Sequence, residues 1–327
     1  MAESLINSIA RLRVIEKSLL TKETAARLAA APSYEEALRT LRECGYGGQA
    51  QPEGDEIDAV IKSELENAYA LVSELMPEKL SAVTDVFRMR HDIVNIKLLY
   101  KLRLLGEDPE GARLDFGGIY PEEELKAAMK RGDYSMLPKV IKDALEELDV
   151  LTYRSPDPRE VARRVDSAYF EYAASIKNPF VKEYFGALAD FTNVIALIRG
   201  AGTKELMPGG ELTSEELSRI AEALPEERER ALSVIKKIGG SKRREALRYG
   251  FEEFMRTGHT AALEKAKDDH LIALASEGRT EIDTVKPIVG YLLAREREAE
   301  VVRLILTAKR SAVPMSAVDE RSLRLYG

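Results

Sequence analysis

The chain has 327 residues, which is enough for two or three hydrophobic cores and excludes a single small domain. About a third of the residues are charged and 45% are hydrophobic, which is typical of a protein that folds by itself and excludes a disordered chain. The net charge of -7 argues against a nucleic-acid-binding protein that works by bulk electrostatic attraction.

The sequence fits a protein of the reducing cytosol. Its single cysteine, Cys44, cannot form an internal disulfide, and we expect it to be packed in the fold. The first residues, MAESLINSIARLR, lack the basic and apolar segments of a secretory signal. Apolar runs such as VVRLILTA are interrupted by charges, here Arg303, and none reaches the ~20 residues of a membrane helix. We therefore expect the chain to serve any membrane from outside it.

Apolar residues recur at steps of three and four over residues 4–31 and again over 55–76, which predicts amphipathic helices. The stripes are Leu5, Ile9, Leu12, Ile15 and Leu19, then Ile57, Ile61, Leu65, Ala68 and Leu75. Alternating patterns bounded by turn residues, the signal of strands, are missing from the sequence. The predicted fold class is all-α.

Gly and Pro cluster between the periodic segments and mark predicted breaks. The clusters are residues 45–55, 106–121, 153–158 and 200–210. We take the second and fourth as domain boundaries. The predicted helical units are residues 1–110, 111–205 and 206–327.

An internal repeat with a period of about a hundred residues is the most informative feature. FRMRHDIVNIKLLYKLRLLG starts at Phe87, and FGALADFTNVIALIRGAG starts at Phe185, with Phe, Asp and Asn at the same offsets. A third, weaker copy, LAREREAEVVRLILTAKR, keeps the acid and loses the amide. The matched positions are Phe87, Phe185 and Leu293; Asp92, Asp190 and Glu298; and Asn95, Asn193 and Val301.

The linkers repeat as well. Gly117-Gly118 is followed after four residues by Glu123-Glu124-Leu125, and Gly209-Gly210 is followed after four residues by Glu215-Glu216-Leu217. Each linker is expected to start a new helix, with Pro121 near one first turn and Ser214 as N-cap of the other. The two motifs agree on nearly the same period and indicate three copies of one helical unit.

The repeated helix has two open interpretations. Residues 93–105 are apolar around most of the circumference, which predicts a helix buried on all sides at the centre of its unit. Asp92 and Asn95 share a face at its N-terminal end, where they are able to bond to each other or to exposed backbone amides. Either these residues are structural caps and struts, or the recurring face binds a partner.

Motifs that would indicate catalysis are missing. GYGGQ at 45–49 and GGSKRRE at 239–245 do not have the sequence of a phosphate-binding loop. We expect Ser241 instead to cap a helix whose first turns expose Lys242, Arg243 and Arg244. Asp268, Asp269 and His270 adjoin on a predicted helix and so point in different directions. No catalytic, cofactor-binding or metal-binding residue is predicted.

Several segments together resemble a known family. They are the two D-x-x-N helices, DSAYFEYA (166–173), the Tyr46-Gly47-Gly48 turn and PIVGYLLAREREAEVVRLILTAKR (287–310). Their order and spacing resemble the C subunit of V/A-type rotary ATPases, the counterpart of the d subunit in vacuolar ATPases. The resemblance spans nearly the whole chain, although at the N-terminus only NSIARLR (7–13) echoes the family's start.

The resemblance implies three similar helical units in a pseudo-threefold, funnel- or socket-shaped arrangement. It implies a non-catalytic central-stalk subunit that couples the rotating D- and F-type shaft subunits to the membrane proteolipid ring, for ATP-linked proton or sodium transport. The chain would then be peripheral to the membrane, at its cytoplasmic face, with no cofactor and no nucleic-acid partner.

The resemblance also implies candidate contacts with other subunits on the repeated helices. In the last of these helices, acids alternate with arginines, which predicts an exposed stripe of ion pairs. The stripe comprises Arg295, Glu296, Arg297, Glu298, Glu300 and Arg303. The candidate contact residues are Asp92, Asn95, Asp190, Asn193, Glu296, Glu298 and Arg303.

Two alternatives from other classes stay open at this point. A helical-repeat scaffold of an unrelated cytosolic complex would also explain the repeat. An α-helical enzyme with a site around Asp92, Asp190 and Glu298 would need a closed, partly dry pocket.

Overall fold

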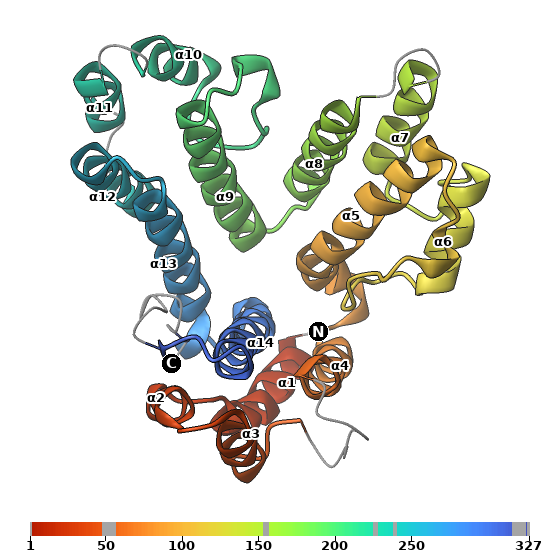
Figure 1. Ribbon diagram of the computed structural model, residues 1–327, viewed down its shortest axis with the longest axis vertical. Coiled ribbons are helices and arrows are strands. Elements are labelled where there is room, and N and C mark those ends of the chain that lie inside the picture. Colours follow the sequence, from red (N-terminus) through yellow and green to blue (C-terminus); the bar gives the residue numbers. More distant parts are fainter. Residues whose placement is uncertain are drawn as a thin grey trace. The chain divides into compact units, whose positions relative to one another are not determined.

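A computed structural model describes residues 2–47, 57–152, 157–224, 228–237, 241–315 and 325. Every regular element within these residues is a helix, which confirms the predicted all-α class (Figure 1). Parts of two predicted breaks lie outside the described residues, namely residues 48–55 of the break at 45–55 and residues 153–156 of the break at 153–158, and so do Gly239 and Gly240. The chain packs as two compact units, residues 1–84 with 272–327 (unit 1) and residues 85–271 (unit 2). The three consecutive helical units stay a prediction.

Unit 1 is built around its last helix. It contains α1 (Ala2–Ile15), η1 (Glu16–Ser18), α2 (Lys22–Ala30), α3 (Tyr34–Glu43), α4 (Ile57–Leu75), η2 (Glu78–Leu80), η5 (Gly278–Thr280) and α14 (Lys286–Arg310). Helix α14 contacts α1, α2, α3 and α4 (Figure 1). A helix from the C-terminal part of the chain is therefore enclosed by helices from the N-terminal part.

The helix predicted over 4–31 is two helices. Helix α1 ends at Ile15, and α2 begins after Thr21, whose side chain accepts a hydrogen bond from the backbone N–H of Thr24. The apolar stripe still has the predicted inward face, since Leu5, Ile9 and Leu12 are buried. A threonine N-cap thus interrupts a helical periodicity that continues past it. The stripe predicted over 55–76 is confirmed in α4, where all five of its residues are buried.

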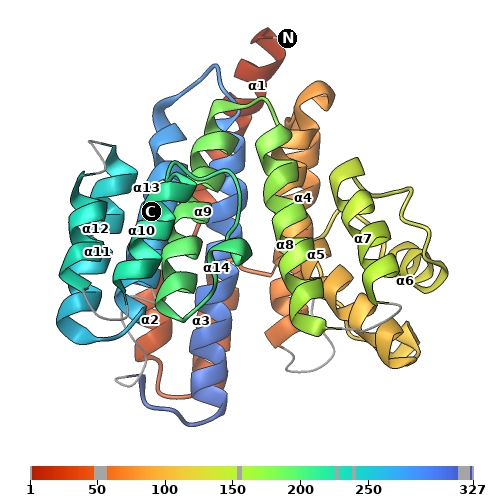
Figure 2. The ribbon, with the colours of Figure 1, turned by 90° about the horizontal axis from the view of Figure 1, so that it is seen from above.

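Unit 2 contains most of α5 (Ser81–Leu105) and most of α13 (Ala261–Glu277), which also extend into unit 1. Between them lie η3 (Pro109–Gly111), α6 (Glu122–Arg131), α7 (Lys139–Thr152), α8 (Pro158–Ser175), α9 (Pro179–Ile198), η4 (Thr203–Glu205), α10 (Ser214–Ala223), α11 (Arg228–Lys237) and α12 (Lys242–Thr257). Helix α8 packs against α7 and α9, and α10 packs against α9 and α11 (Figure 2). Neighbours in sequence are therefore mostly neighbours in space.

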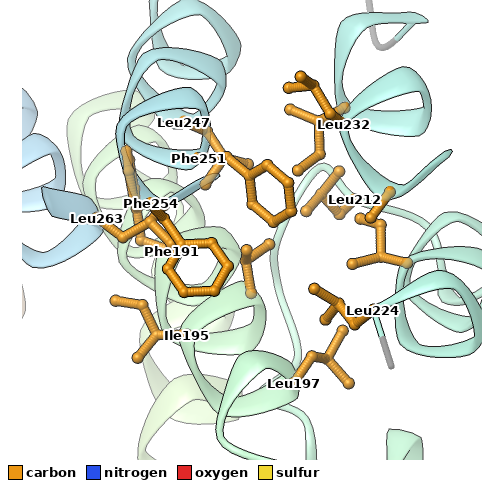
Figure 3. Close-up of a cluster of buried hydrophobic side chains, with 14 of the residues drawn as sticks. Phe191, Ile195, Leu197, Leu212, Leu224, Leu232, Leu247, Phe251, Phe254 and Leu263 are labelled. Carbon is orange, nitrogen blue, oxygen red and sulfur yellow. The ribbon is translucent and has the colours of Figure 1, made fainter. Parts of the chain in front are cut away.

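The last five helices of unit 2 share one hydrophobic core. Phe191 of α9, Phe251 of α12 and Leu263 of α13 belong to it (Figure 3), and each of these side chains is fully buried. Gly250 allows α12 and α13 to approach closely, because a Cβ at this position would press against Leu263 and against Ala266 in α13. Burying such side chains stabilises the fold by roughly 1.5–3 kcal/mol each.

A cluster of aromatic rings connects the first two copies of the repeat. The rings of Phe87 in α5 and Phe185 in α9 lie 5.4 Å apart, centroid to centroid. Tyr169 of α8 packs edge-on against Phe185 at 5.5 Å and donates a hydrogen bond of 2.8 Å to the carbonyl oxygen of Val86. The phenylalanine positions of the repeat therefore pack against each other.

Two predictions about burial are wrong. Residues 93–105 are not buried on all sides, since Val94, Leu98 and Leu105 are 50%, 36% and 71% exposed. These three share one side of α5, and the packing of unit 2 covers the other side. Cys44 is exposed at the end of α3 rather than packed.

None of the described helices is long and apolar enough to span a bilayer.

Candidate functional site: acidic clamps on the glycine loops

The repeated acid of α5 binds the backbone of the Gly117-Gly118 linker. The Asp92 carboxylate is buried and accepts hydrogen bonds from the N–H groups of Ile119 at 2.8 Å and Tyr120 at 3.4 Å. A Cβ at Gly118 would overlap this carboxylate. Only glycine therefore lets the linker reach the acid, and we call this arrangement the first clamp.

Two more side chains of α5 fix the same linker. The Asn95 amide donates to the carbonyl oxygen of Asp115 at 2.8 Å and accepts from the N–H of Asp115 at 2.7 Å. The guanidinium of Arg88 donates to the carbonyl oxygens of Gly117 at 3.1 Å and Gly118 at 2.5 Å. The linker's backbone groups are thus bonded to one face of α5.

The second copy repeats this pattern and forms the second clamp. Asp190 accepts hydrogen bonds from the N–H groups of Glu211 at 3.1 Å and Leu212 at 3.0 Å. Asn193 donates to the carbonyl oxygen of Met207 at 2.8 Å and accepts from its N–H at 2.6 Å. A Cβ at Gly210 would overlap the Asp190 carboxylate. In both copies the repeated acid and amide therefore bind backbone groups of the chain, as expected of structural struts, and the binding of a partner by this face stays a prediction.

The cation of the second clamp comes from another helix. The position that corresponds to Arg88 is Gly186, and the guanidinium of Arg243 in α12 lies against it. Arg243 pairs with Asp190 at 3.2 Å and donates to the carbonyl oxygen of Glu183 at 2.9 Å. The expected exposure of Arg243 is wrong, because this side chain is only 7% exposed. The expected cap is confirmed, since Ser241 accepts from the N–H of Arg244 and so sets the start of α12.

The acid of the third copy also binds backbone, but not in a linker that follows it. Glu298 in α14 accepts a hydrogen bond of 2.5 Å from the N–H of Leu20, between η1 and α2. Arg295 pairs with Glu298 at 2.9 Å and with Glu64 of α4 at 2.9 Å. This third clamp therefore connects the C-terminal helix to the N-terminal part of the chain, within unit 1.

The predicted exposed stripe on α14 is wrong for three of its residues. Arg295, Glu296 and Glu298 are 4%, 4% and 2% exposed. Their burial follows from the position of α14 among α1–α4, and they are paired there, with the hydroxyl of Tyr69 donating to Glu296 at 3.2 Å. Glu300 and Arg303 are exposed, as predicted.

Burial shifts the titration of the clamp acids. It raises the pKa of Asp92 to about 6, against the opposing effect of the hydrogen bonds from Ile119 and Tyr120. It raises the pKa of Glu298 to about 7, although Arg295 and the N–H of Leu20 favour the charged form. Burial also raises the pKa of Asp190, opposed by its two backbone hydrogen bonds and by Arg243. The clamps therefore hold loops at the cost of burying charge.

The candidate contact residues divide into two groups. All except Arg303 are buried and bonded within the chain. Arg303 is exposed and pairs with Asp58 of α4 at 3.2 Å. Their part in contacts with other subunits stays a prediction.

Sequence reasoning missed Arg88 as part of the first clamp and Arg243 as part of the second. Arg88 could have been found from its place one helical turn before Asp92. Arg243 could have been suspected because the corresponding position in the second copy is a glycine, Gly186, so that the cation there has to come from elsewhere. The linker itself was predicted, but the expected cap Ser214 is wrong. Thr213 caps α10 through a capping box with Glu216, while Pro121 precedes α6 as expected. Within the described residues, no His, Cys, Asp and Glu side chains group so that they would hold a metal ion.

Comparison with known proteins finds one matching family and several similar proteins. The model of the ATP synthase (C/AC39) subunit family matches residues 8–321. The C subunit of the A-type ATP synthase of Methanocaldococcus jannaschii is 23% identical, over 92% of this chain and 81% of the relative. The corresponding subunit of the A-type ATP synthase of Pyrococcus abyssi is 21% identical, over 95% and 88%. The C subunit of the V-type sodium ATPase of Enterococcus hirae is 21% identical, over 98% of each chain.

The family model and these three relatives each cover nearly the whole chain. The chain therefore belongs to the ATP synthase (C/AC39) subunit family and is similar throughout to the C subunits of A-type and V-type ATPases.

Proposed function

We propose that the chain is the non-catalytic central-stalk subunit of a V/A-type rotary ATPase, seating the rotating D- and F-type shaft subunits on the membrane proteolipid ring. The observation that carries the proposal is the family match over residues 8–321. In this role the chain lies at the cytoplasmic face of the membrane, peripheral to it, and takes part in ATP-linked proton or sodium transport.

The clamps support a mechanical role. A protein that passes torque must keep its loops in place under load, and packed helices resist deformation because protein interiors are close-packed. Asp92 and Asp190 fix the glycine linkers of unit 2, and Glu298 fixes the approach to α2 in unit 1. Each carboxylate bonds to backbone of the chain itself, which leaves it less available for chemistry on a substrate.

The unrelated scaffold and the α-helical enzyme are each less well supported than this proposal, for different reasons. A scaffold of an unrelated complex does not explain the match to this family over nearly the whole chain. An enzyme built on Asp92, Asp190 and Glu298 would need free carboxylates, whereas each of these accepts backbone hydrogen bonds.

The test is binding of the purified chain to the shaft subunits and, separately, to the detergent-solubilised proteolipid ring of the same organism. We expect a complex of defined stoichiometry with each, measured by isothermal titration calorimetry and size-exclusion chromatography. A well-folded chain that binds neither would contradict the proposal.

A matched pair of variants tests the one exposed contact candidate. Arg303→Glu and Arg39→Glu each replace an exposed arginine of unit 1 that pairs with an acid, and each changes the net charge equally. We expect Arg303→Glu to weaken binding to the shaft or the ring while Arg39→Glu leaves it unchanged. Equal affinities for both variants would remove Arg303 from the contact surface.

A further inference from the structure

A pocket of about 530 Å³ opens in unit 2 beside the second clamp. The end of α8, the start of α9 and the loop before Gly210 form its walls. The apolar lining includes Phe170, Ile176, Phe185 and Pro208. Such a volume is large enough for one or two apolar side chains of a partner.

The charged groups of the pocket are all positive. Lys177 and Lys182 belong to its lining, and no Asp or Glu does. Both lysines are exposed, and neither forms an ion pair within the described part of the chain. Exposed lysines elsewhere often have such a partner, as Lys139 has in Asp143. The pocket thus combines apolar walls with uncompensated positive charge.

The pocket exists where the second copy of the repeat differs from the first. At the corresponding place in α5, the side chain of Arg88 reaches the carbonyl oxygens of the glycine linker. In α9 this place is Gly186, which lines the pocket, and the guanidinium of Arg243 lies against it from α12. The Asp190 clamp holds the linker next to it, and Phe185 is buried behind it. The walls are therefore fixed before any ligand arrives, which favours binding.

We propose that this pocket receives an apolar side chain from an acidic segment of another subunit of the same ATPase, with its carboxylates on Lys177 and Lys182. The proposal rests on the function proposed above and names a surface for it. A protein segment is able to supply the apolar side chain for the pocket and the carboxylates for the two lysines together. An anionic bilayer fits less well, because its flat headgroup surface would meet the exposed Glu171 and Glu183 together with the two lysines, whereas a single segment is able to contact the lysines and avoid the glutamates.

The first experiment places a photo-crosslinking amino acid, p-benzoylphenylalanine, at Ala174 in the assembled ATPase. Ala174 is exposed and lines the pocket, so the substitution leaves the core unchanged. We expect a crosslink to one acidic segment of a neighbouring subunit, identified by mass spectrometry. Crosslinks only to lipid, or none to another subunit, would overturn the proposal.

The second experiment measures the affinity of Lys177→Glu/Lys182→Glu for the shaft subunits and for the solubilised ring. We expect the dissociation constant for one of the two to rise about tenfold, with a weaker dependence on salt than for the unmodified chain. Lys17→Glu/Lys22→Glu in unit 1 is the control, with the same change in charge at exposed lysines and unchanged affinity expected.

The outcomes separate this inference from the proposed function. If the unmodified chain binds and the pocket variant binds equally well, the pocket assignment is wrong and the adapter function stands. If the unmodified chain binds neither shaft nor ring, both fall. If the pocket variant loses only binding to vesicles that contain phosphatidylglycerol, the partner is a membrane and the assignment to a protein segment is wrong.

Discussion

The first and second clamps form the same hydrogen bonds and balance their charge differently. In each, an aspartate at the same place in a repeated helix accepts two backbone N–H groups of a glycine linker. In the second clamp, Arg243 pairs directly with the carboxylate of Asp190. In the first clamp, Arg88 bonds to the linker's carbonyl oxygens, and no direct ion pair to Asp92 appears in the described structure.

This difference teaches that a repeat preserves the geometry of a contact more strictly than its electrostatics. The acid and the glycine are fixed by sterics, because a Cβ in the linker would overlap the carboxylate in either copy. The cation only has to reach the same region, so it is free to come from α5 in one copy and α12 in the other. The two clamps should therefore respond differently to the same substitution.

Removal of the acid should give the largest effect, and a larger one in the second clamp. Asp190→Ala removes the acceptor of two backbone N–H groups, of which that of Leu212 is buried, and among the described residues it leaves the buried Arg243 with only the half-exposed Glu211 as an ion-pair partner. We therefore expect a loss of about 4 kcal/mol in the free energy of unfolding. Asp92→Ala leaves only the N–H groups, and we expect a loss of about 2–3 kcal/mol. Urea unfolding followed by circular dichroism measures both.

The double variant Asp190→Ala/Arg243→Met sharpens this comparison. It removes the poorly paired cation together with the acid, so we expect it to be more stable than Asp190→Ala alone. If the double variant instead loses as much stability as Asp190→Ala and Arg243→Met lose together when each is measured alone, Arg243 acts independently of the clamp.

The glycines of the linkers should come next. Gly210→Ala and Gly118→Ala each force a methyl group against a clamp carboxylate, so we expect each to lower the free energy of unfolding by about 2 kcal/mol. Gly202→Ala is the control, since nothing lies within 4 Å of its Cβ position and its φ is -75°. Thermal melting of the three variants measures the difference, and equal melting temperatures would contradict the steric origin of the glycine pairs.

The next effect is a pH dependence of the free energy of unfolding, which the titration of Asp92 should cause. Its pKa rises from an ordinary 3.8 to about 6 on folding, so the folded chain holds this proton more tightly than the unfolded chain. The contribution of Asp92 to stability is therefore present at low pH and is lost as the pH rises from about 4 to about 6, by roughly 2 kcal/mol.

Asp92→Asn removes that proton and should flatten the profile. We expect the variant to gain stability relative to the unmodified chain as the pH rises from 4 to 7, measured by urea unfolding at each pH. Asp133→Asn serves as control, because hydrogen bonds from Ser135 lower the pKa of the exposed Asp133 and no change is expected above pH 5. A constant difference between Asp92→Asn and the unmodified chain over this range would exclude Asp92 as the titrating group.

The smallest effect on stability is expected at Arg303. Its ion pair with Asp58 is half-exposed on both sides, and such pairs contribute about 0–1 kcal/mol. Arg303→Ala should therefore shift the melting temperature by less than any clamp variant. A shift as large as that of Asp92→Ala would mean that Arg303 belongs to the fold and not to a contact surface.

The sequence was sufficient for the fold class, for the repeat and for the glycine linkers, because periodicity and offsets are local signals. It was sufficient to choose Asp92 and Asp190 as special, but not to say what they bind. The burial of Arg243, Arg295 and Glu298 depends on which helices pack around them, and that packing joins residues far apart in sequence. The charge pattern of α14 is the same in either case, so it did not distinguish an exposed stripe from a buried one.

The third clamp has a consequence for how the chain is made. Its hydrogen bond joins Leu20 and Glu298, which are 278 residues apart. At a translation rate of roughly 5–20 residues per second, Leu20 leaves the ribosome about 15–60 s before Glu298 follows. Unit 2 is continuous in sequence and is able to fold in that interval. During synthesis the N-terminal helices must therefore keep their apolar faces from aggregating, and a chain that stops before α14 should be a substrate for chaperones and proteases.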